Sequence, residues 1–153
     1  MIMNIGKYSN FIVAVIIIFV IGCDTDSGKS TVNNIIEYHA EDLAYDDDDS
    51  YTERYVLYTD EGSYERYIGG IYRGKDFGDI VLGTLFETGT YERDTRYGGI
   101  WFSSKKSYDF EKERLVNLGM DKQERFWGKV STTSLTIEWH INNKYIPITY
   151  KLK

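Results

Sequence analysis

The chain has little of three residue types on which much protein chemistry depends. It contains one cysteine, Cys23, one proline, Pro147, and two histidines, His39 and His140. A single cysteine cannot form an internal disulfide, and two histidines so far apart give no zinc-ligand spacing. No serine lies in a Gly-x-Ser-x-Gly pattern, and 24 acidic residues offer no means of choosing a catalytic pair. We therefore predict no metal, no cofactor and no catalytic residue.

The charge balance is acidic and excludes another class of function. The chain has 18 basic and 24 acidic residues, a formal charge of −6 and a sequence pI near 4.9. Binding to nucleic acid or to anionic headgroups needs clustered cations. We therefore expect no nucleic-acid partner, and a basic or neutral partner fits better.

The first 23 residues have the layout of an export signal. Lys7 precedes an unbroken apolar run of 11 residues, Phe11 to Ile21, whereas a transmembrane helix needs about 20. The run leads into Val20-Ile21-Gly22-Cys23, which resembles the lipobox of bacterial lipoproteins. This resemblance implies cleavage before Cys23 and attachment of lipid to its thiol.

The signal divides the chain into three parts. Residues 1–22 are the predicted signal peptide, residues 23–34 the lipidated cysteine with a polar tether, and residues 35–153 a single β-rich domain. The resemblance implies a protein of the bacterial cell envelope whose membrane contact is the lipid on Cys23. It leaves open which membrane, and which of its faces, carries the domain.

The C-terminal segment predicts a β-hairpin with a defined register. Asn142-Asn143 suits a two-residue turn, because asparagine tolerates the positive φ that such turns require. Paired residue numbers then sum to 285, so that Ile137 faces Ile148 on an apolar side and Glu138 faces Pro147 on the other. Because Pro147 has no amide hydrogen, we expect it at an edge or a bulge.

Other β elements are predicted from short runs of aromatic and β-branched residues. Two more hairpins are expected around Glu61-Gly62 and Thr88-Gly89, with strands at residues 55–59 and 64–68, and at 80–87 and 90–93. Further strands are expected at residues 97–103 and 125–130.

Two segments and one loop are less regular. Residues 108–123 fit a helix or a charged hairpin, and the apolar spacing of residues 32–44 favours a short helix over a strand. Asp46 to Asp49 cannot lie on a packed strand, because adjacent carboxylates repel one another. We expect a solvated acidic loop there, with a calcium site as the alternative.

Many short strands joined by hairpins avoid exposed edges by closing into a barrel or by forming a sandwich. The sequence therefore predicts an all-β, mainly antiparallel domain. We expect a small lipocalin-like β-barrel or a sandwich, with a short N-terminal helix as an option.

The dipeptide Glu-Arg recurs, and two occurrences lie in near copies, Tyr64-Glu65-Arg66 and Tyr91-Glu92-Arg93. On a strand, neighbouring residues point to opposite faces, so in each pair the glutamate would lie on one face of the sheet and the arginine on the other. A barrel lined by such arginines among tyrosines could bind a carboxylate- or phosphate-bearing amphiphile. The speculative ligand-binding residues are Arg66, Arg93, Arg125, Tyr64, Tyr67 and Tyr91. The alternative is ion pairing across strands on a solvated face.

Three functions stay open. The first is a non-catalytic binding lipoprotein that takes a ligand into an arginine-bearing lumen or onto a tyrosine-rich surface around the first hairpin; a filled core would exclude the lumen form. The second is a protein-binding inhibitor or adhesin with an envelope or host protein as partner. The third is a hydrolase using Glu138 and His140, which share a strand face and which we expect to be exposed.

Overall fold

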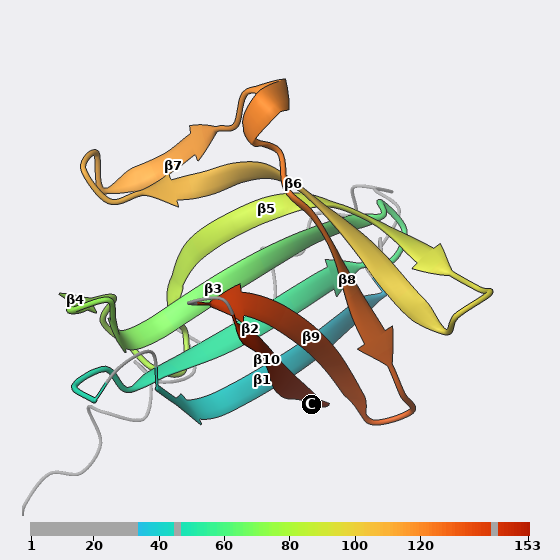
Figure 1. The fold of residues 1–153 in the computed structure, drawn as a ribbon, viewed down its shortest axis with the longest axis horizontal. Coiled ribbons are helices and arrows are strands. Elements are labelled where there is room, and N and C mark those ends of the chain that lie inside the picture. The colour runs from blue at the N-terminus through green and yellow to red at the C-terminus, as the bar shows by residue number, and fades with distance from the viewer. Residues whose placement is uncertain (1–33, 45–46, 142–143) are drawn as a thin grey trace, which may run out of the picture. The chain divides into compact units, whose positions relative to one another are not determined.

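The computed structural model describes residues 34–44, 47–141 and 144–153, which build a closed antiparallel β-barrel (Figure 1). Cys23 and the lipobox lie outside the described residues. The strands are β1 (Ile35–Leu43), β2 (Tyr51–Tyr58), β3 (Ser63–Tyr72), β4 (Lys75–Asp76), β5 (Thr84–Asp94), β6 (Gly99–Asp109), β7 (Arg114–Asn117), β8 (Arg125–Val130), β9 (Ser134–Ile141) and β10 (Lys144–Leu152). One 3₁₀ turn, η1 (Met120–Lys122), precedes β8. Within the described residues, no helix has the length and apolarity needed to cross a bilayer.

Eight of the strands form the barrel wall in the order β1-β2-β3-β5-β6-β8-β9-β10. The wall closes where β1 meets β10 through Tyr38 with Leu152 and His39 with Lys151. The predicted all-β, lipocalin-like barrel is therefore confirmed. Strand β4 pairs only with β3, and β7 extends β6 into a hairpin that projects from the wall (Figure 1).

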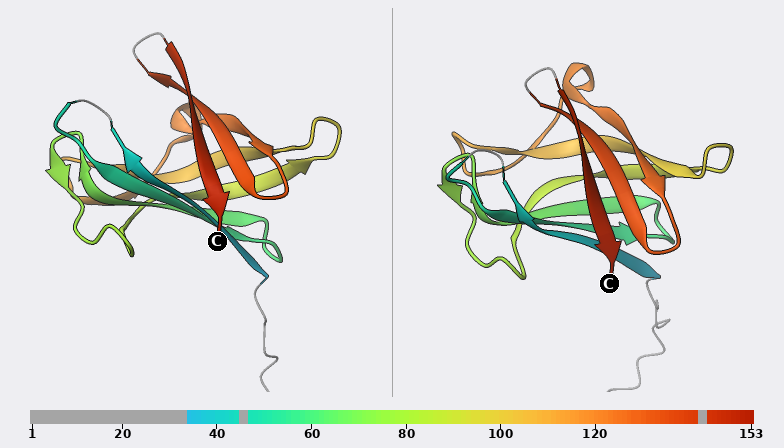
Figure 2. Two further views of the ribbon diagram at one scale, coloured as in Figure 1. Left: turned by 90° about the horizontal axis from the view of Figure 1, so that it is seen from below. Right: turned by 60° about the horizontal axis from the view of Figure 1, so that its bottom comes forward.

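The barrel has two different ends. One end carries the start of β1, the C-terminal end of β10 and the β2–β3, β5–β6 and β8–β9 turns. The other carries the β1–β2 and β3–β5 connections and the β9–β10 turn. Figure 2 shows the beginning of β1 and the C-terminus together at the first end.

The middle of the barrel is packed with side chains. Tyr55, Tyr64 and Phe102 are almost fully buried, with ring centroids 5.0–6.1 Å apart. Leu135 and Ile137 complete this layer. This filled core excludes the expected open lumen, and the cavities inside the described barrel lie toward its two ends.

The C-terminal hairpin was predicted correctly. All eight residue pairs of β9 and β10, from Ile141 with Lys144 to Ser134 with Lys151, follow the expected register. The turn residues themselves lie outside the described residues. Pro147 pairs with Glu138, and β1 joins β10 only at Lys151 and Leu152, so the proline occupies an edge as expected. The hairpin around Glu61-Gly62 is also confirmed.

Two expectations were wrong. The segment expected to be a short helix is strand β1, whose residues Tyr38 and Ala40 point into the core while His39 pairs with Arg54. The alternation of buried and more exposed residues in this segment fits a strand better than a helix. The Thr88-Gly89 turn is absent, because β5 runs straight through it.

Gly89 serves a close approach between strands. A Cβ there would lie 2.6 Å from Cε1 of Tyr64 and against the backbone oxygen of Ser103. The glycine therefore marks a packing contact at an irregularity of the β5–β6 ladder. For residues 108–123, the charged hairpin of β6 and β7 is the correct alternative.

Candidate functional site

At the first end, the barrel contains a cavity of about 520 Å³. Its apolar lining consists of Ile36, Tyr38, Leu57, Ile100, Val130 and Leu152, contributed by five strands. Polar groups stand beside them at the end of β5, where Arg93 and Asp94 lie, and on the β8–β9 turn, where Thr132 lies. We call this space the apolar cavity. Its volume lies in the range of small-molecule sites.

Arg93 is the cation of the apolar cavity. It is exposed on β5, faces Ile100 across the strand pair, and forms no ion pair with any residue in the described part of the chain. Asp94 does not neutralise it by contact, because the Asp94 carboxylate accepts hydrogen bonds from the backbone of Arg96 and Tyr97 and from the Trp101 ring. The guanidinium is therefore available to an anion.

Two tyrosines respond to this charge. Burial raises the pKa of Tyr38 and of Tyr91, and the nearby charge of Arg93 opposes that rise in both. Tyr38 lines the cavity, and Tyr91 belongs to the core beneath it. Arg93 therefore acts electrostatically on the cavity interior.

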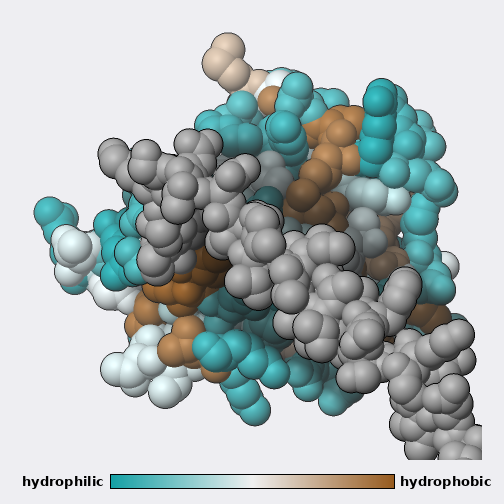
Figure 3. All heavy atoms as spheres, turned by 180° about the vertical axis from the view of Figure 1, so that it is seen from behind, coloured by the Kyte–Doolittle hydropathy of each residue, from teal (hydrophilic) through white to brown (hydrophobic). Residues whose placement is uncertain are grey.

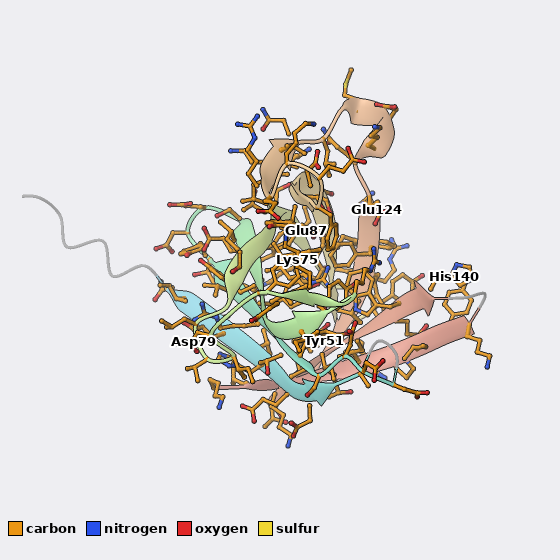
Figure 4. All side chains as sticks on the ribbon, turned by 90° about the vertical axis from the view of Figure 1, so that its left-hand side faces the viewer. Tyr51, Lys75, Asp79, Glu87, Glu124 and His140 are labelled. Atoms are coloured by element: carbon orange, nitrogen blue, oxygen red, sulfur yellow. The ribbon has the colours of Figure 1, made fainter. Side chains whose placement is uncertain are left out.

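At the opposite end, a second cavity of about 410 Å³ opens between aromatic side chains. We call it the aromatic mouth, and its aromatic residues are Tyr51, Tyr72, Phe86, Tyr108, Phe110 and Trp139. Five of them pack edge-to-face or stacked against one another, as Phe86 does with Tyr108 and Phe110. Figure 4 looks onto this side, with Tyr51, Glu87, Glu124 and His140 labelled.

The floor of the aromatic mouth is a buried network of charges. Arg66 on β3 donates to Glu53 on β2, and its Nη1 lies 3.8 Å from Oε2 of Glu87 on β5. The hydroxyl of Tyr150 donates to Glu53, and that of Tyr64 donates to Glu87. Burial alone would lower the pKa of Arg66, but the two carboxylates outweigh it and keep this group charged.

The network is not fully hydrogen-bonded. Nε of Arg66 has no hydrogen-bond partner among the described residues, and neither has the hydroxyl of Tyr55. Oε2 of Glu87 has only the distant contact to Arg66, which exceeds hydrogen-bonding distance. Nε of Arg66 and the Tyr55 hydroxyl are themselves buried, so Glu87, which lines the mouth, is the member of this network that a bound molecule could engage.

The six candidate residues from the sequence do not form one site. Arg66 and Tyr64 lie in the buried network, whereas Arg93 and Tyr91 lie at the apolar cavity. The remaining two lie on the outer surface. Arg125 stacks over Trp101 at 4.8 Å and pairs with Glu92, and Tyr67 donates to Glu65.

The other sequence candidates have structural roles. Asp47 and Asp48 are exposed in a turn, as expected for a loop, while Asp49 is buried and accepts hydrogen bonds from the backbone of Arg73 and Gly74. In the part of the chain that the structure describes, no group of three acidic, histidine or cysteine residues could hold a metal ion.

Glu138 and His140 give no support to a hydrolase. Both are exposed, and the ring of His140 lies 5.0 Å from that of Tyr145. Of the tyrosines of the first hairpin, Tyr51, Tyr55, Tyr64 and Tyr72 are buried, whereas Tyr58 and Tyr67 are half-buried and both donate to Glu65.

Two residues of the candidate site, Glu53 and Glu87, were not among those predicted from the sequence. The signal for Glu53 was present, since it alternates with Tyr51, Tyr55 and Leu57 on a face that is otherwise apolar. Searches against protein-family models, curated proteins and solved structures found no match. The class of ligand must therefore be inferred from the geometry of the two cavities.

Proposed function

We propose that this protein is a lipid-anchored, non-catalytic binding protein of the bacterial cell envelope, and that its apolar cavity takes a small anionic amphiphile. The observation that carries the proposal is the position of Arg93. A guanidinium without an ion pair in the described residues stands beside a cavity whose lining is mainly apolar. Such a cavity suits an apolar tail, and the guanidinium suits a carboxylate or phosphate head.

The anchoring part of the proposal rests on the resemblance of Val20-Ile21-Gly22-Cys23 to a lipobox. Residue 34, where the predicted polar tether ends, leads into β1 at the same end of the barrel as the apolar cavity. The predicted tether would thus enter the domain at that end. Stable anchoring generally takes two acyl chains. The lipid modification implied by the resemblance to lipoproteins would provide them.

The binding proposal is tested with dodecanoate as the probe. All barrel strands and both core clusters lie between residues 35 and 152, so residues 24–153 retain the whole described structure. Calorimetric titration should show one site. Arg93→Gln should weaken binding about tenfold, because charge-assisted hydrogen bonds contribute about 1.5–3 kcal/mol.

Arg96→Gln is the matched control, because Arg96 lies three residues further along the chain, in the β5–β6 turn, and does not line the apolar cavity. It should bind dodecanoate like the unaltered protein. Equal losses in both variants, or no dodecanoate binding at all, would contradict the proposed ligand class.

The anchor is tested separately. Mass spectrometry of the protein from its host should find an N-terminus at Cys23 carrying acyl chains. An unmodified Cys23, or a chain that retains residues 1–22, would refute the anchor and leave the binding proposal standing.

A protein-binding role is the second candidate, and one loop favours it. Ile80, Val81 and Leu82 are 54%, 74% and 64% exposed in the connection before β5. The side chain of Asp79 accepts hydrogen bonds from the backbone of Val81 and Leu82, which fixes the loop's shape. Apolar surface also appears in patches among polar residues on the face shown in Figure 3.

A photo-reactive residue at position 81 tests this alternative in the intact host. A discrete protein adduct that is absent when the same residue is placed at exposed Tyr97 would support it. Adducts of equal yield at both positions would count against it.

A further inference from the structure

The aromatic mouth has an unbalanced charge at its floor. Glu53 and Glu87 are 1% and 7% exposed, and among the residues that the structure describes the only buried cation in contact with them is Arg66. Arg66 bonds closely to Glu53 alone, so the Glu87 carboxylate is only partly compensated. A buried carboxylate without full compensation is costly unless a cation joins it.

The walls of the mouth already hold cations against aromatic rings. Arg66 lies 4.7 Å from the ring centroid of Trp139 and 5.2 Å from that of Phe86. At the rim, Arg73 lies 5.2 Å from the Tyr72 ring, and Nζ of Lys75 lies 5.7 Å from the Tyr108 ring. The negative faces of these rings attract cations, so the mouth is electrostatically suited to positive charge.

The mouth also has an acceptor and space for a ligand. Oε1 of Glu87 is occupied by the Tyr64 hydroxyl, but Oε2 makes no hydrogen bond with any described residue. Glu87 lines the cavity of about 410 Å³ directly. A donor that enters the mouth would therefore meet a carboxylate with one oxygen that is not engaged in a hydrogen bond with a described residue.

We propose that the aromatic mouth is a second binding site, separate from the apolar cavity, and that it takes a small organic cation: an ammonium group carried on an apolar or aromatic body. The ammonium donates to Oε2 of Glu87, and the body packs against Phe86, Phe110 and Trp139. Charges on the lining residues favour this class over an anion, because Glu53, Glu87 and Glu124 outnumber Arg66 and Arg73.

Three probes that share a phenylethyl body and differ in charge test the charge requirement on the full-length chain in detergent micelles. They are 2-phenylethylamine, neutral 2-phenylethanol and anionic 3-phenylpropionate. NMR titration should show saturable shifts of the Trp139 indole signal with the amine, at an affinity at least tenfold higher than with the alcohol. The propionate should bind most weakly.

Glu87→Gln tests the predicted contact. The glutamine oxygen can still accept from Tyr64, so the variant retains that hydrogen bond while losing the negative charge. Amine affinity should fall at least tenfold, and affinity for the alcohol should stay the same. Glu92→Gln is the matched control, because Glu92 lies on the same strand but is exposed on the outer surface.

A second variant keeps the test decisive if Glu87→Gln does not fold. Phe110→Leu removes a partly buried ring from the mouth without changing any charge, and it should weaken amine binding severalfold. Equal binding of all three probes, absence of saturable binding, or an unchanged amine affinity in a folded Glu87→Gln variant would each overturn the proposal.

Discussion

The near copies Tyr64-Glu65-Arg66 on β3 and Tyr91-Glu92-Arg93 on β5 lie on neighbouring antiparallel strands. In both, the tyrosine is buried and the arginine follows two residues later on the inner side. Because the strands run in opposite directions, Arg66 points to the aromatic mouth and Arg93 to the apolar cavity.

The residues across the strands then give the two arginines different roles. Arg66 lies between Glu53 on β2 and Glu87 on β5 and is buried with them. Arg93 faces Ile100 and has no carboxylate partner among the described residues. The same local sequence thus yields a structural ion pair at one end and an available anion-binding group at the other.

The largest expected effect tests the buried side of this comparison. Arg66→Met leaves two carboxylates facing each other without a cation, which should lower the free energy of unfolding by about 3–5 kcal/mol. Urea denaturation of residues 24–153 measures it. Arg125→Met, which removes an exposed arginine from the outer surface, should change stability by less than about 1 kcal/mol. Similar losses in both variants would contradict a special role for the buried network.

A smaller effect separates the two cavities. Val130 lines the apolar cavity only, so Val130→Phe should place a ring in existing space. Dodecanoate affinity should fall about tenfold, since each methylene that loses its buried position costs about 0.8 kcal/mol. Binding of 2-phenylethylamine, followed in the same NMR titration, should not change. A parallel loss of both ligands would mean that the ends are not independent.

The smallest expected effect is a difference in the pH at which the tyrosines at the two ends lose their protons. Burial and the neighbouring carboxylates raise the pKa of Tyr64 and of Tyr150, whereas burial raises the pKa of Tyr38 and of Tyr91 against the opposing charge of Arg93. As the pH rises above 10, Tyr38 and Tyr91 should therefore lose their protons before Tyr64 and Tyr150. NMR of ¹³C-labelled tyrosine measures the order, and Arg93→Gln should raise the pKa of Tyr38 further.

The same shifts predict alkaline instability. The folded-state pKa values of these four tyrosines lie above the ordinary value of 10.0. The folded protein therefore holds protons that the unfolded chain releases. The stabilisation is complete below pH 10 and is lost as the pH rises further. Tyr58, whose pKa is raised to about 12 chiefly by its hydrogen bond to Glu65, follows the same sign. Ionisation of Tyr64 near pH 10 in the folded protein would contradict this.

Local patterns carried most of what the sequence predicted correctly. The β9–β10 register follows from one turn and two alternating strands, so neighbouring residues decide it. The turn expected at Thr88-Gly89 was wrong because the glycine is needed for the close approach of Tyr64 and Ser103, which are distant in sequence. The apolar spacing of residues 32–44 misled because short segments can fit two periodicities.

The candidate sites depended on contacts that no local pattern contains. Arg66 and Arg93 follow the same Tyr-Glu dipeptide, and only the positions of Glu53 and Glu87 in the barrel distinguish their environments. Tyr150 reaches Glu53 from 97 residues away. The sequence therefore identified the arginines, while the fold decided what each can bind.

The independence of the two ends is tested most directly by titrating one isotope-labelled sample of the full-length chain with both probes. Dodecanoate should move the backbone signals of Gly98, Gly99 and Thr132, and 2-phenylethylamine should move those of Tyr72, Phe110 and the Trp139 indole, with neither probe displacing the other. If the two probes compete, or if both move the same set of signals, the barrel does not have two chemically distinct binding ends.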